Sequence, residues 1–132
     1  SNKKNINIEI QNIVNTNDVS KVGCGTHCSF ILSNNNILNI FGYFKYKHRI
    51  IPNIIDFNCG GIHAGYITLK RDIYMIGHNG YCQCGLLSDI DYCDYIPNEL
   101  LTNKQIKSVT CGYAHTIIKT NDNEYYSFGL NE

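Results

Sequence analysis

The sequence predicts an all-β fold built from repeated four-stranded blades, and three observations carry that prediction. A Cys-Gly pair recurs at Cys24, Cys59 and Cys111, and a Gly follows each of these Cys residues after 18 positions. Short β-favouring runs bounded by Gly, Asn, Asp or Pro fill the space between. No run of ten or more residues has helical periodicity. A recurring block of fixed length indicates units that bury their apolar faces by stacking on one another.

Each block is expected to contribute its strands in the same order. The lead-ins "NDVSKVGCG" and "NKQIKSVTCG" approach the first and third Cys-Gly pairs as strands, with Val19 matching Ile106 and Val22 matching Val109. Two β-favouring runs follow each pair: "SFIL" and "ILNIF", "YITL" and "IYMI", "HTIIK" and "YYSF". The polar segments "SNNN", "KRD" and "TNDNE" separate them as turns. Because radial repetition of small sheets leaves only short, protected edges, the expected architecture is a β-propeller.

The chain is interpreted as one repeat segment over residues 1–132, with repeats at about 10–50, 51–95 and 96–132. The third repeat ends at "SFGLNE", before a closing strand, and is therefore truncated. About two and a half repeats make an incomplete ring, so we expect a segment of a larger protein. Unpaired sheet edges recruit other strands, which makes self-association to complete blades a further expectation.

Composition narrows the class of partner and the compartment. Eleven basic and eleven acidic residues leave no net charge to steer the chain toward nucleic acid or a membrane surface. No apolar run approaches membrane-spanning length. Seven Cys in a chain of 132 residues are an odd number spread through a domain too large for a typical disulfide framework. We therefore expect a soluble intracellular protein, cytoplasmic or nuclear.

The Cys and His residues raise the alternative of a zinc site, since thiolate and imidazole are preferred zinc ligands. The pairs Cys59/His63 and Cys111/His115 recur once per repeat and would lie on different blades, so packing is the favoured interpretation. We predict that the three first-strand cysteines are equivalent, buried and unbridged. A Cys-His nucleophile is disfavoured because catalysis needs one asymmetric site, and this pair is repeated.

A second cluster, Cys82 and Cys84 with Cys93, leaves metal binding or a disulfide open, although a plain loop is favoured because a fourth ligand is missing. No phosphate-binding Gly-rich signature with a Lys-Ser/Thr pair is present. We therefore expect no cofactor, no metal and no enzymatic activity.

The stretch "IGHNGYCQCGLL" resembles the G-x-N-x-x-G-Q-L-G loop of the regulator of chromosome condensation (RCC1) repeat family. Four positions match, Gly77, Asn79, Gln83 and Gly85, while Cys82 and Cys84 stand where the family usually has Gly and Leu. The family's V-x-C-G-x-x-H block and strand-opening Pro also have matches: Val109, Cys111, Gly112 and His115 with Pro97, and Cys59, Gly60 and His63 with Pro52. The first repeat departs most, since Cys28 takes the His position and "YFKYKHR" replaces the loop.

This resemblance implies an RCC1-like propeller, in which seven blades close a ring, acting as a binding platform. The leading interpretation is a non-catalytic protein-interaction module of a larger intracellular protein. The alternative that the resemblance implies is a guanine-nucleotide exchange factor for a Ran-like small GTPase, with docking on chromatin. No contact residue of that activity can be matched to this sequence.

Two irregular connectors are the predicted partner-binding loops, because loops on a fixed frame carry recognition. Residues 43–49, "YFKYKHR", are basic and aromatic, whereas residues 88–95, "SDIDYCDY", are acidic and rich in Tyr. Loops of opposite charge favour protein recognition; nucleic acid for the first loop and simple packing on the blades remain alternatives. Aromatic and Arg side chains dominate interface hot spots, so six anchors are predicted: Tyr43, Phe44, Tyr46, Arg49, Tyr92 and Tyr95.

Overall fold

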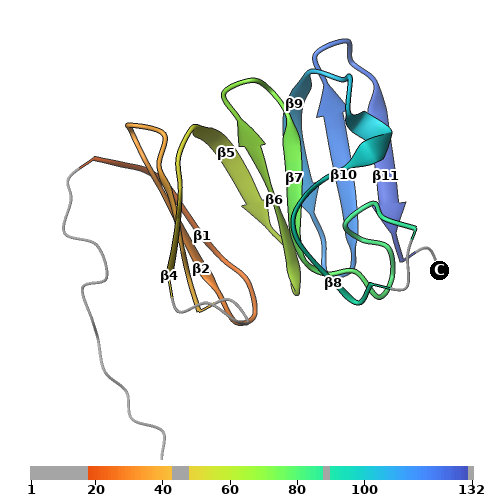
Figure 1. Ribbon diagram of the computed structural model, residues 1–132, viewed down its shortest axis with the longest axis horizontal. Helices are drawn as coiled ribbons and strands as arrows, with labels where there is room; N and C mark the ends of the chain where they lie inside the picture. Colours follow the sequence, from red (N-terminus) through yellow and green to blue (C-terminus); the bar gives the residue numbers. More distant parts are fainter. Residues whose placement is uncertain (1–17, 43–47, 88–89, 131–132) are drawn as a thin grey trace, which may run out of the picture.

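A computed structural model of the chain describes residues 18–42, 48–87 and 90–130 and contains three antiparallel sheets, here called blades, standing side by side (Figure 1). In each blade the strands are neighbours in chain order. Blade 1 comprises β1 (Val19–Cys24), β2 (Ser29–Ser33), β3 (Leu38–Phe41) and β4 (His48–Ile51). Blade 2 comprises β5 (Ile54–Cys59), β6 (His63–Thr68), β7 (Ile73–His78) and β8 (Tyr92–Pro97). Blade 3 comprises β9 (Ile106–Cys111), β10 (His115–Thr120) and β11 (Tyr125–Gly129).

The predicted all-β class is confirmed, and the described part of the chain forms an open row of blades and not a closed ring (Figure 1). A short 3-10 helix, η1 (Glu99–Leu101), lies between β8 and β9. The first strands of blades 2 and 3 pack on the blade before them: β5 packs on β1 and β2, and β9 packs on β5 and β6. No helix among the described residues is long and apolar enough to cross a membrane.

The same turn joins the second and third strands of every blade. Its fourth residue has a positive φ, at Asn36 (64°), Arg71 (67°) and Asn123 (62°). A hydroxyl at the start of each turn accepts a hydrogen bond of 3.2 Å from the backbone N–H four residues later; the three donors and acceptors are Ile37 to Ser33, Asp72 to Thr68 and Glu124 to Thr120. Asn tolerates positive φ better than Arg does. All three blades therefore keep the same turn geometry, although blade 2 has Arg71 at the positive-φ position where the other blades have Asn.

At the opposite end of the blades, backbone hydrogen bonds run across all three. The N–H of Thr26 in blade 1 donates to the Gly61 carbonyl at 3.0 Å, and the Gly61 N–H donates to the Gly112 carbonyl at 3.3 Å. A Cβ on Gly60 would stand 2.4 Å from that same Gly112 carbonyl. The Gly of the repeated Cys-Gly pair is thus required by the close approach of neighbouring blades.

Alternation along the strands places apolar side chains between the blades, in two separate core clusters. The cluster between blades 1 and 2 contains Phe30, Leu32, Leu38, Ile40, Ile54, Phe57, Ala64, Tyr66 and Ile76. The cluster between blades 2 and 3 contains Ile67, Ile73, Met75, Cys84, Cys93, Leu101, Ile106, Val109 and Ile118. Stability therefore comes from contacts between blades, as expected for repeats that cannot bury an apolar face alone.

The first-strand cysteines occupy the same place at the ends of β1, β5 and β9, and all three are free thiols. The prediction that all are buried is wrong for Cys24, which is exposed, while Cys59 and Cys111 are half-buried. The burial differs because each of these thiols points toward the preceding blade. Cys111 lies 3.5 Å from the Asn58 carbonyl of β5, and Cys59 packs against the cluster between blades 1 and 2. No described blade stands before Cys24.

Candidate functional site

Of the six predicted anchors, Tyr43, Phe44 and Tyr46 lie outside the described residues. The other three lie on the two outer strands that face each other across blades 1 and 2: Arg49 on β4, and Tyr92 and Tyr95 on β8. The structure therefore brings part of the first predicted loop and part of the second to the same side of the molecule.

Arg49 holds blade 1 to blade 2. Its guanidinium carbon lies 3.4 Å from the centroid of the Tyr95 ring, and its Nη1 lies 2.5 Å from Oδ1 of Asp94. Only 7% of Arg49 is exposed. A guanidinium over an aromatic face and against a carboxylate is a favourable arrangement when it is withdrawn from water. Arg49 thus contacts the neighbouring blade from a buried position.

The two tyrosines of β8 retain an exposed surface. Tyr92 is 45% exposed and meets the His78 ring edge-on, with centroids 5.2 Å apart. Tyr95 is 40% exposed and meets the buried Tyr66 edge-on at 6.5 Å. Tyr81, 48% exposed, lies 6.0 Å from His78 and extends the aromatic surface. Rings held by neighbours with one side open are suited to contacts with a partner.

The connector between β7 and β8 carries Tyr81 and leads into β8, which carries Tyr92 and Tyr95. Two polar residues of the G-x-N-x-x-G-Q-L-G-like loop hold this connector. Asn79 is 1% exposed; its Nδ2 donates to the carbonyls of Leu86 (3.1 Å) and Ile90 (3.3 Å), and its Oδ1 accepts from the Cys84 N–H (3.0 Å). Gln83 is fully buried, and its Oε1 accepts from the Tyr81 N–H at 2.9 Å. The buried side-chain amide of Asn79 therefore joins the start of the connector to Leu86 and Ile90 farther along it.

Gln83 also belongs to a hydrogen-bond relay between blades 2 and 3. The Thr116 hydroxyl of β10 donates to the Gln83 carbonyl at 2.7 Å, and His63 Nε2 of β6 lies 2.8 Å from the same hydroxyl oxygen. Because the single hydroxyl hydrogen is donated to the backbone carbonyl of Gln83, the Thr116 oxygen accepts a hydrogen bond from the N–H of His63 Nε2. Burial lowers the pKa of His63 to about 4, so the ring is neutral at pH 7. His63 is a structural residue of the blade contact.

The surroundings of four cysteine thiols shift their pKa values: those of Cys59, Cys84 and Cys111 are raised, and that of Cys28 is lowered. Hydrogen bonding between Cys84 and Cys93, with burial, raises the pKa of Cys84 far above its usual range, and burial raises the pKa of Cys111 to about 12. Cys28 differs: a hydrogen bond with Cys59 lowers the pKa of the Cys28 thiol to about 7. All seven cysteines are unbridged, and the described residues contain no group of three Cys, His, Asp or Glu side chains that could hold a metal ion.

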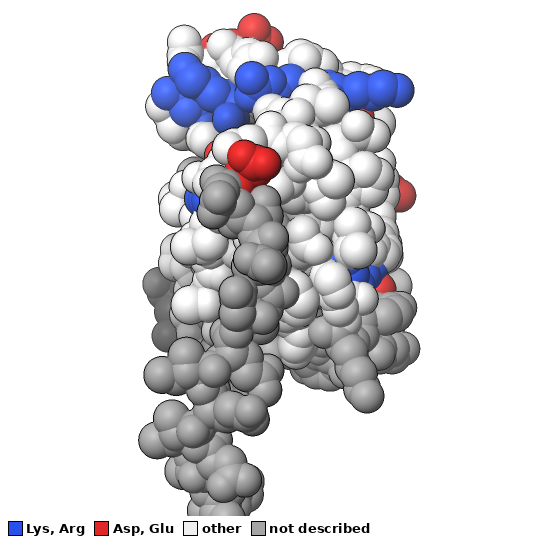
Figure 2. Space-filling model, turned by 90° about the vertical axis from the view of Figure 1, so that its left-hand side faces the viewer, with Lys and Arg blue, Asp and Glu red and all other residues white. Residues whose placement is uncertain are grey.

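Charge gathers away from the centre of the blades. Lys and Arg side chains form a band near the end of the molecule that carries the hairpin turns (Figure 2). Several basic groups have acidic partners: Lys21 lies 2.8 Å from Asp56, and Lys104 lies 3.3 Å from Glu124. Exposed pairs of this kind contribute little stability, but they reduce the positive charge available to a polyanion.

Sequence reasoning missed two features of this region. Thr116 was not singled out, although its position directly after His115 in a repeat with a conserved-length block is the signal that could have found it. The second feature is an apolar groove lined by Leu86, Leu87, Ile90, Ile96 and Leu100. The adjacent leucines in "GLL" and "ELL" are the sequence signal that could have indicated it.

Comparison with known proteins agrees with the repeat architecture. Sequence models described as "Regulator of chromosome condensation (RCC1) repeat" match residues 72–118 and 106–132. The chain is 23% identical over 128 residues to the ultraviolet-B receptor UVR8 of Arabidopsis thaliana, covering 84% of this chain and 29% of that protein. It is 33% identical over 93 residues to the X-linked retinitis pigmentosa GTPase regulator of Mus musculus, covering 70% of this chain and 9% of that protein.

Among solved structures, Prp20p of Saccharomyces cerevisiae superposes with a TM-score of 0.72 at 18% identity, covering 89% of this chain and 32% of that chain. That structure was described together with the binding properties of Prp20p to Gsp1p and histones. The chain spans less than a third of the length of each of these three proteins. The likeness to Prp20p establishes the fold of the blades.

Proposed function

Because this chain belongs to the RCC1 repeat family, we propose that it is a protein-interaction module in which a rigid frame of blades presents connector residues to a protein partner. The carrying observation is the β7–β8 connector. Asn79 and Gln83 fix it from inside, while Tyr81 on the connector and Tyr92 and Tyr95 on the adjoining strand β8 stay 40–48% exposed. A surface that is rigid beneath and aromatic outside loses little entropy on binding.

Alanine substitutions test this surface. Tyr92→Ala and Tyr95→Ala are expected to weaken binding of a partner, isolated by crosslinking to the wild-type chain, by about tenfold each. The matched control is Tyr125→Ala on blade 3, since Tyr125 is 65% exposed and lies on β11, away from β8. Melting temperatures are measured in parallel. Retained binding in both variants, or lowered binding that only follows a lowered melting temperature, contradicts the proposal.

The predicted anchors Tyr43, Phe44 and Tyr46 lie outside the described residues and join this proposal as further partner contacts, close in sequence to Arg49, which contacts Tyr95. Arg49 has a different role in it: the residue fixes Tyr95 and is expected to affect stability more than partner contact. Arg49→Ala should lower the melting temperature, whereas Tyr43→Ala, Phe44→Ala and Tyr46→Ala should lower affinity alone.

A second candidate is guanine-nucleotide exchange on a Ran-like GTPase with chromatin docking. It is favoured by the superposition on Prp20p, whose described binding properties concern Gsp1p and histones. The test is release of a fluorescent GDP analogue from a Ran-type GTPase with and without the chain. A release rate that rises with the concentration of the chain supports exchange. An unchanged release rate, with partner binding to Tyr92 and Tyr95 intact, contradicts exchange and supports the interaction module.

We further propose that the module works inside the cell and that its end faces associate. Seven unbridged thiols are consistent with a reducing compartment. Blade 1 exposes Val22 (68%) and Ile50 (63%) away from blade 2, and blade 3 exposes Ile117 (42%), whose neighbour Ile118 packs toward blade 2. Sedimentation should show concentration-dependent association of the isolated chain. A monomer at high concentration argues against it.

A further inference from the structure

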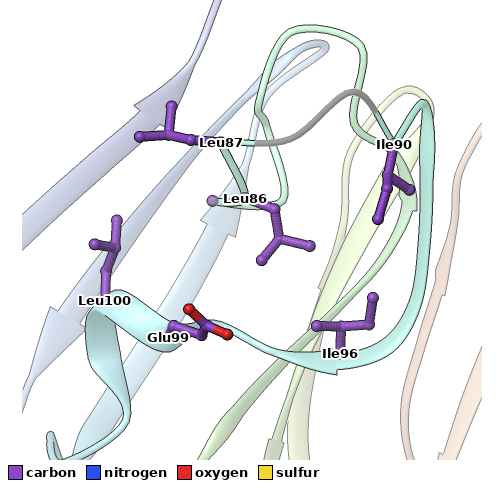
Figure 3. A pocket seen from close by; sticks show the side chains of 7 residues that line it. Leu86, Leu87, Ile90, Ile96, Glu99 and Leu100 are labelled. Carbon is purple, nitrogen blue, oxygen red and sulfur yellow. The ribbon is translucent and has the colours of Figure 1, made fainter.

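The groove beside η1 lies on the other face of β8 from the aromatic surface. Ile96 packs toward the cluster between blades 2 and 3, whereas Tyr95 contacts Arg49 of blade 1. The groove encloses about 400 Å³. In Figure 3 the side chains of Leu86, Ile96 and Glu99 point toward a common space, with Leu87, Ile90 and Leu100 around it.

The walls of this groove are held in place by buried polar contacts. Asn98 is 1% exposed; its Oδ1 accepts from the Leu100 N–H at 3.0 Å and its Nδ2 donates to the Cys84 carbonyl at 3.3 Å. Gly85 has a φ of +79°, and a Cβ there would stand 1.7 Å from Nδ2 of Asn98. Asn98 therefore joins the η1 side of the groove to the connector side, and the groove is a built feature of the fold.

The lining is open to solvent and almost wholly aliphatic. Leu87 is 90% exposed, Leu100 is 65% exposed and Ile90 is 47% exposed. Exposed leucines gathered around a hollow mark a binding surface far more often than scattered ones do. Glu99 is the one ionisable residue of the lining, and it forms no ion pair with any described residue. The groove therefore suits a ligand with apolar side chains and one positive charge.

The form of the ligand follows from the edge of β8. Two residues of β8, Asp94 and Tyr95, stand opposite Ile76 alone, because Cys93 pairs with Gly77 and Ile96 pairs with Met75. Tyr95 has a φ of +59°, and Pro97 ends the strand. Bulges and Pro at an edge oppose the addition of another strand. Among the described residues, the lining has none of the aromatic rings that receive Pro-rich segments, so side-chain insertion from a helix, with anchors at spacings of three and four residues, is the docking mode that fits.

We propose that this groove binds an amphipathic helix of a protein partner, inserting two aliphatic side chains three or four residues apart between Leu86, Leu87, Ile96 and Leu100 and placing a Lys or Arg against Glu99. The site is separate from the aromatic surface of the proposed function. It gives the chain two binding faces on opposite sides of one strand.

A charge-exchange experiment tests the proposal. A phage-displayed library of helical peptides is selected on the wild-type chain and counter-selected on Leu100→Asp, whose substitution lies at an exposed side chain. Enriched peptides should carry aliphatic pairs at i and i+3 or i+4 with a neighbouring Lys or Arg. For a synthetic peptide of that pattern, Glu99→Lys should weaken affinity about tenfold, and a peptide with Glu in place of Lys should recover it on that variant.

Tyr92→Ala serves as the matched control, because it lies on the other face of β8 and should leave peptide affinity unchanged. Failure to enrich peptides, enrichment of acidic or Pro-rich sequences, or affinity that Glu99→Lys does not alter overturns the proposal. Loss of partner binding in Tyr92→Ala with peptide binding retained separates this site from the aromatic surface. The converse, peptide binding lost in Tyr92→Ala, would merge the two sites and also overturns the proposal.

Discussion

The two contacts between neighbouring blades are built from equivalent positions but use different chemistry. Between blades 2 and 3, His63 and Thr116 form the relay that ends on the Gln83 carbonyl. At the contact between blades 1 and 2 the corresponding residues are Cys28 and Ala64; Ala64 has no side-chain hydrogen bond, and Cys28 forms a hydrogen bond with Cys59 instead. Both members differ together, which indicates that the relay works as a unit: a buried hydroxyl without its imidazole partner would lose a hydrogen bond.

The contact between blades 1 and 2 has two further side-chain links at other positions. Arg49 pairs with Asp94 between the outer strands, and Lys21 pairs with Asp56 while its ammonium lies 4.9 Å from the Phe57 ring centroid. The apolar cluster there also carries more aromatic rings, with Phe30 and Phe57 at 5.4 Å. The comparison teaches that the repeat fixes the backbone and the apolar layer, whereas the polar link between blades is interchangeable.

The largest expected effect is loss of the relay. His63→Ala removes a ring that is 2% exposed together with its hydrogen bond to Thr116, and should lower the free energy of unfolding by about 4 kcal/mol. Cys28→Ala, at the corresponding position, should cost about 1 kcal/mol because a smaller and half-buried thiol is lost. Urea denaturation measures both. Equal losses in the two variants would mean that the relay adds nothing to the contact between blades 2 and 3.

The pH dependence of stability should report the same contact. The pKa of His63 is about 4 in the folded chain, below the ordinary value of about 6.5, because burial disfavours the charged ring. Between these two pH values the unfolded state binds more protons than the folded state. The free energy of unfolding therefore keeps its full value above pH about 6.5 and falls as the pH drops toward 4, by up to about 3 kcal/mol.

His63→Gln is the matched variant, since it keeps a hydrogen-bonding group without titrating in this range. Denaturation midpoints measured from pH 7.5 to 4 should fall less steeply for His63→Gln than for the wild type. Parallel curves for the two proteins would assign the acid sensitivity to other groups.

The repeat period and the apolar positions could be predicted from the sequence, because strand alternation and spacing are local signals. Cys24, Cys59 and Cys111 fell at equivalent strand ends as expected, but Cys24 is exposed, since burial depends on which blade stands before each thiol. The predicted contact loops supplied Arg49 and Tyr95, yet their mutual stacking joins residues 46 positions apart in the chain. The groove around Leu86 and Leu100 depends on the connector fold set by Asn79 and Asn98, which no local pattern specifies.

A double-mutant cycle on Arg49 and Asp94 measures how much their ion pair contributes to the contact between blades 1 and 2. Arg49 is withdrawn from water while the Asp94 side chain is 37% exposed, so the coupling should be moderate, about 1–2 kcal/mol. Single substitutions to Ala should each destabilise the chain, and the double variant should lose less than their sum. Coupling near zero would show that the Tyr95 ring, and not the carboxylate, holds the guanidinium.

The smallest expected difference concerns the first-strand thiols, and it separates a covered blade face from an open one. The Cys111 thiol lies 3.5 Å from the Asn58 carbonyl, and the Cys111 N–H donates to Asn58 Oδ1 at 2.7 Å, so the residue is packed on the preceding blade. Cys24 occupies the same strand end without such a cover and is exposed. Cys111→Ser places a more polar hydroxyl in a largely apolar contact and should cost about 1 kcal/mol, whereas Cys24→Ser should change stability by less than about 0.5 kcal/mol.

Thermal melts of both variants, with zinc content measured alongside, give the comparison. A loss in Cys24→Ser as large as that in Cys111→Ser would mean that the outward face of blade 1 is covered in solution, and a loss of stoichiometric zinc in Cys111→Ser would replace packing with metal binding as the reason for the repeated cysteine.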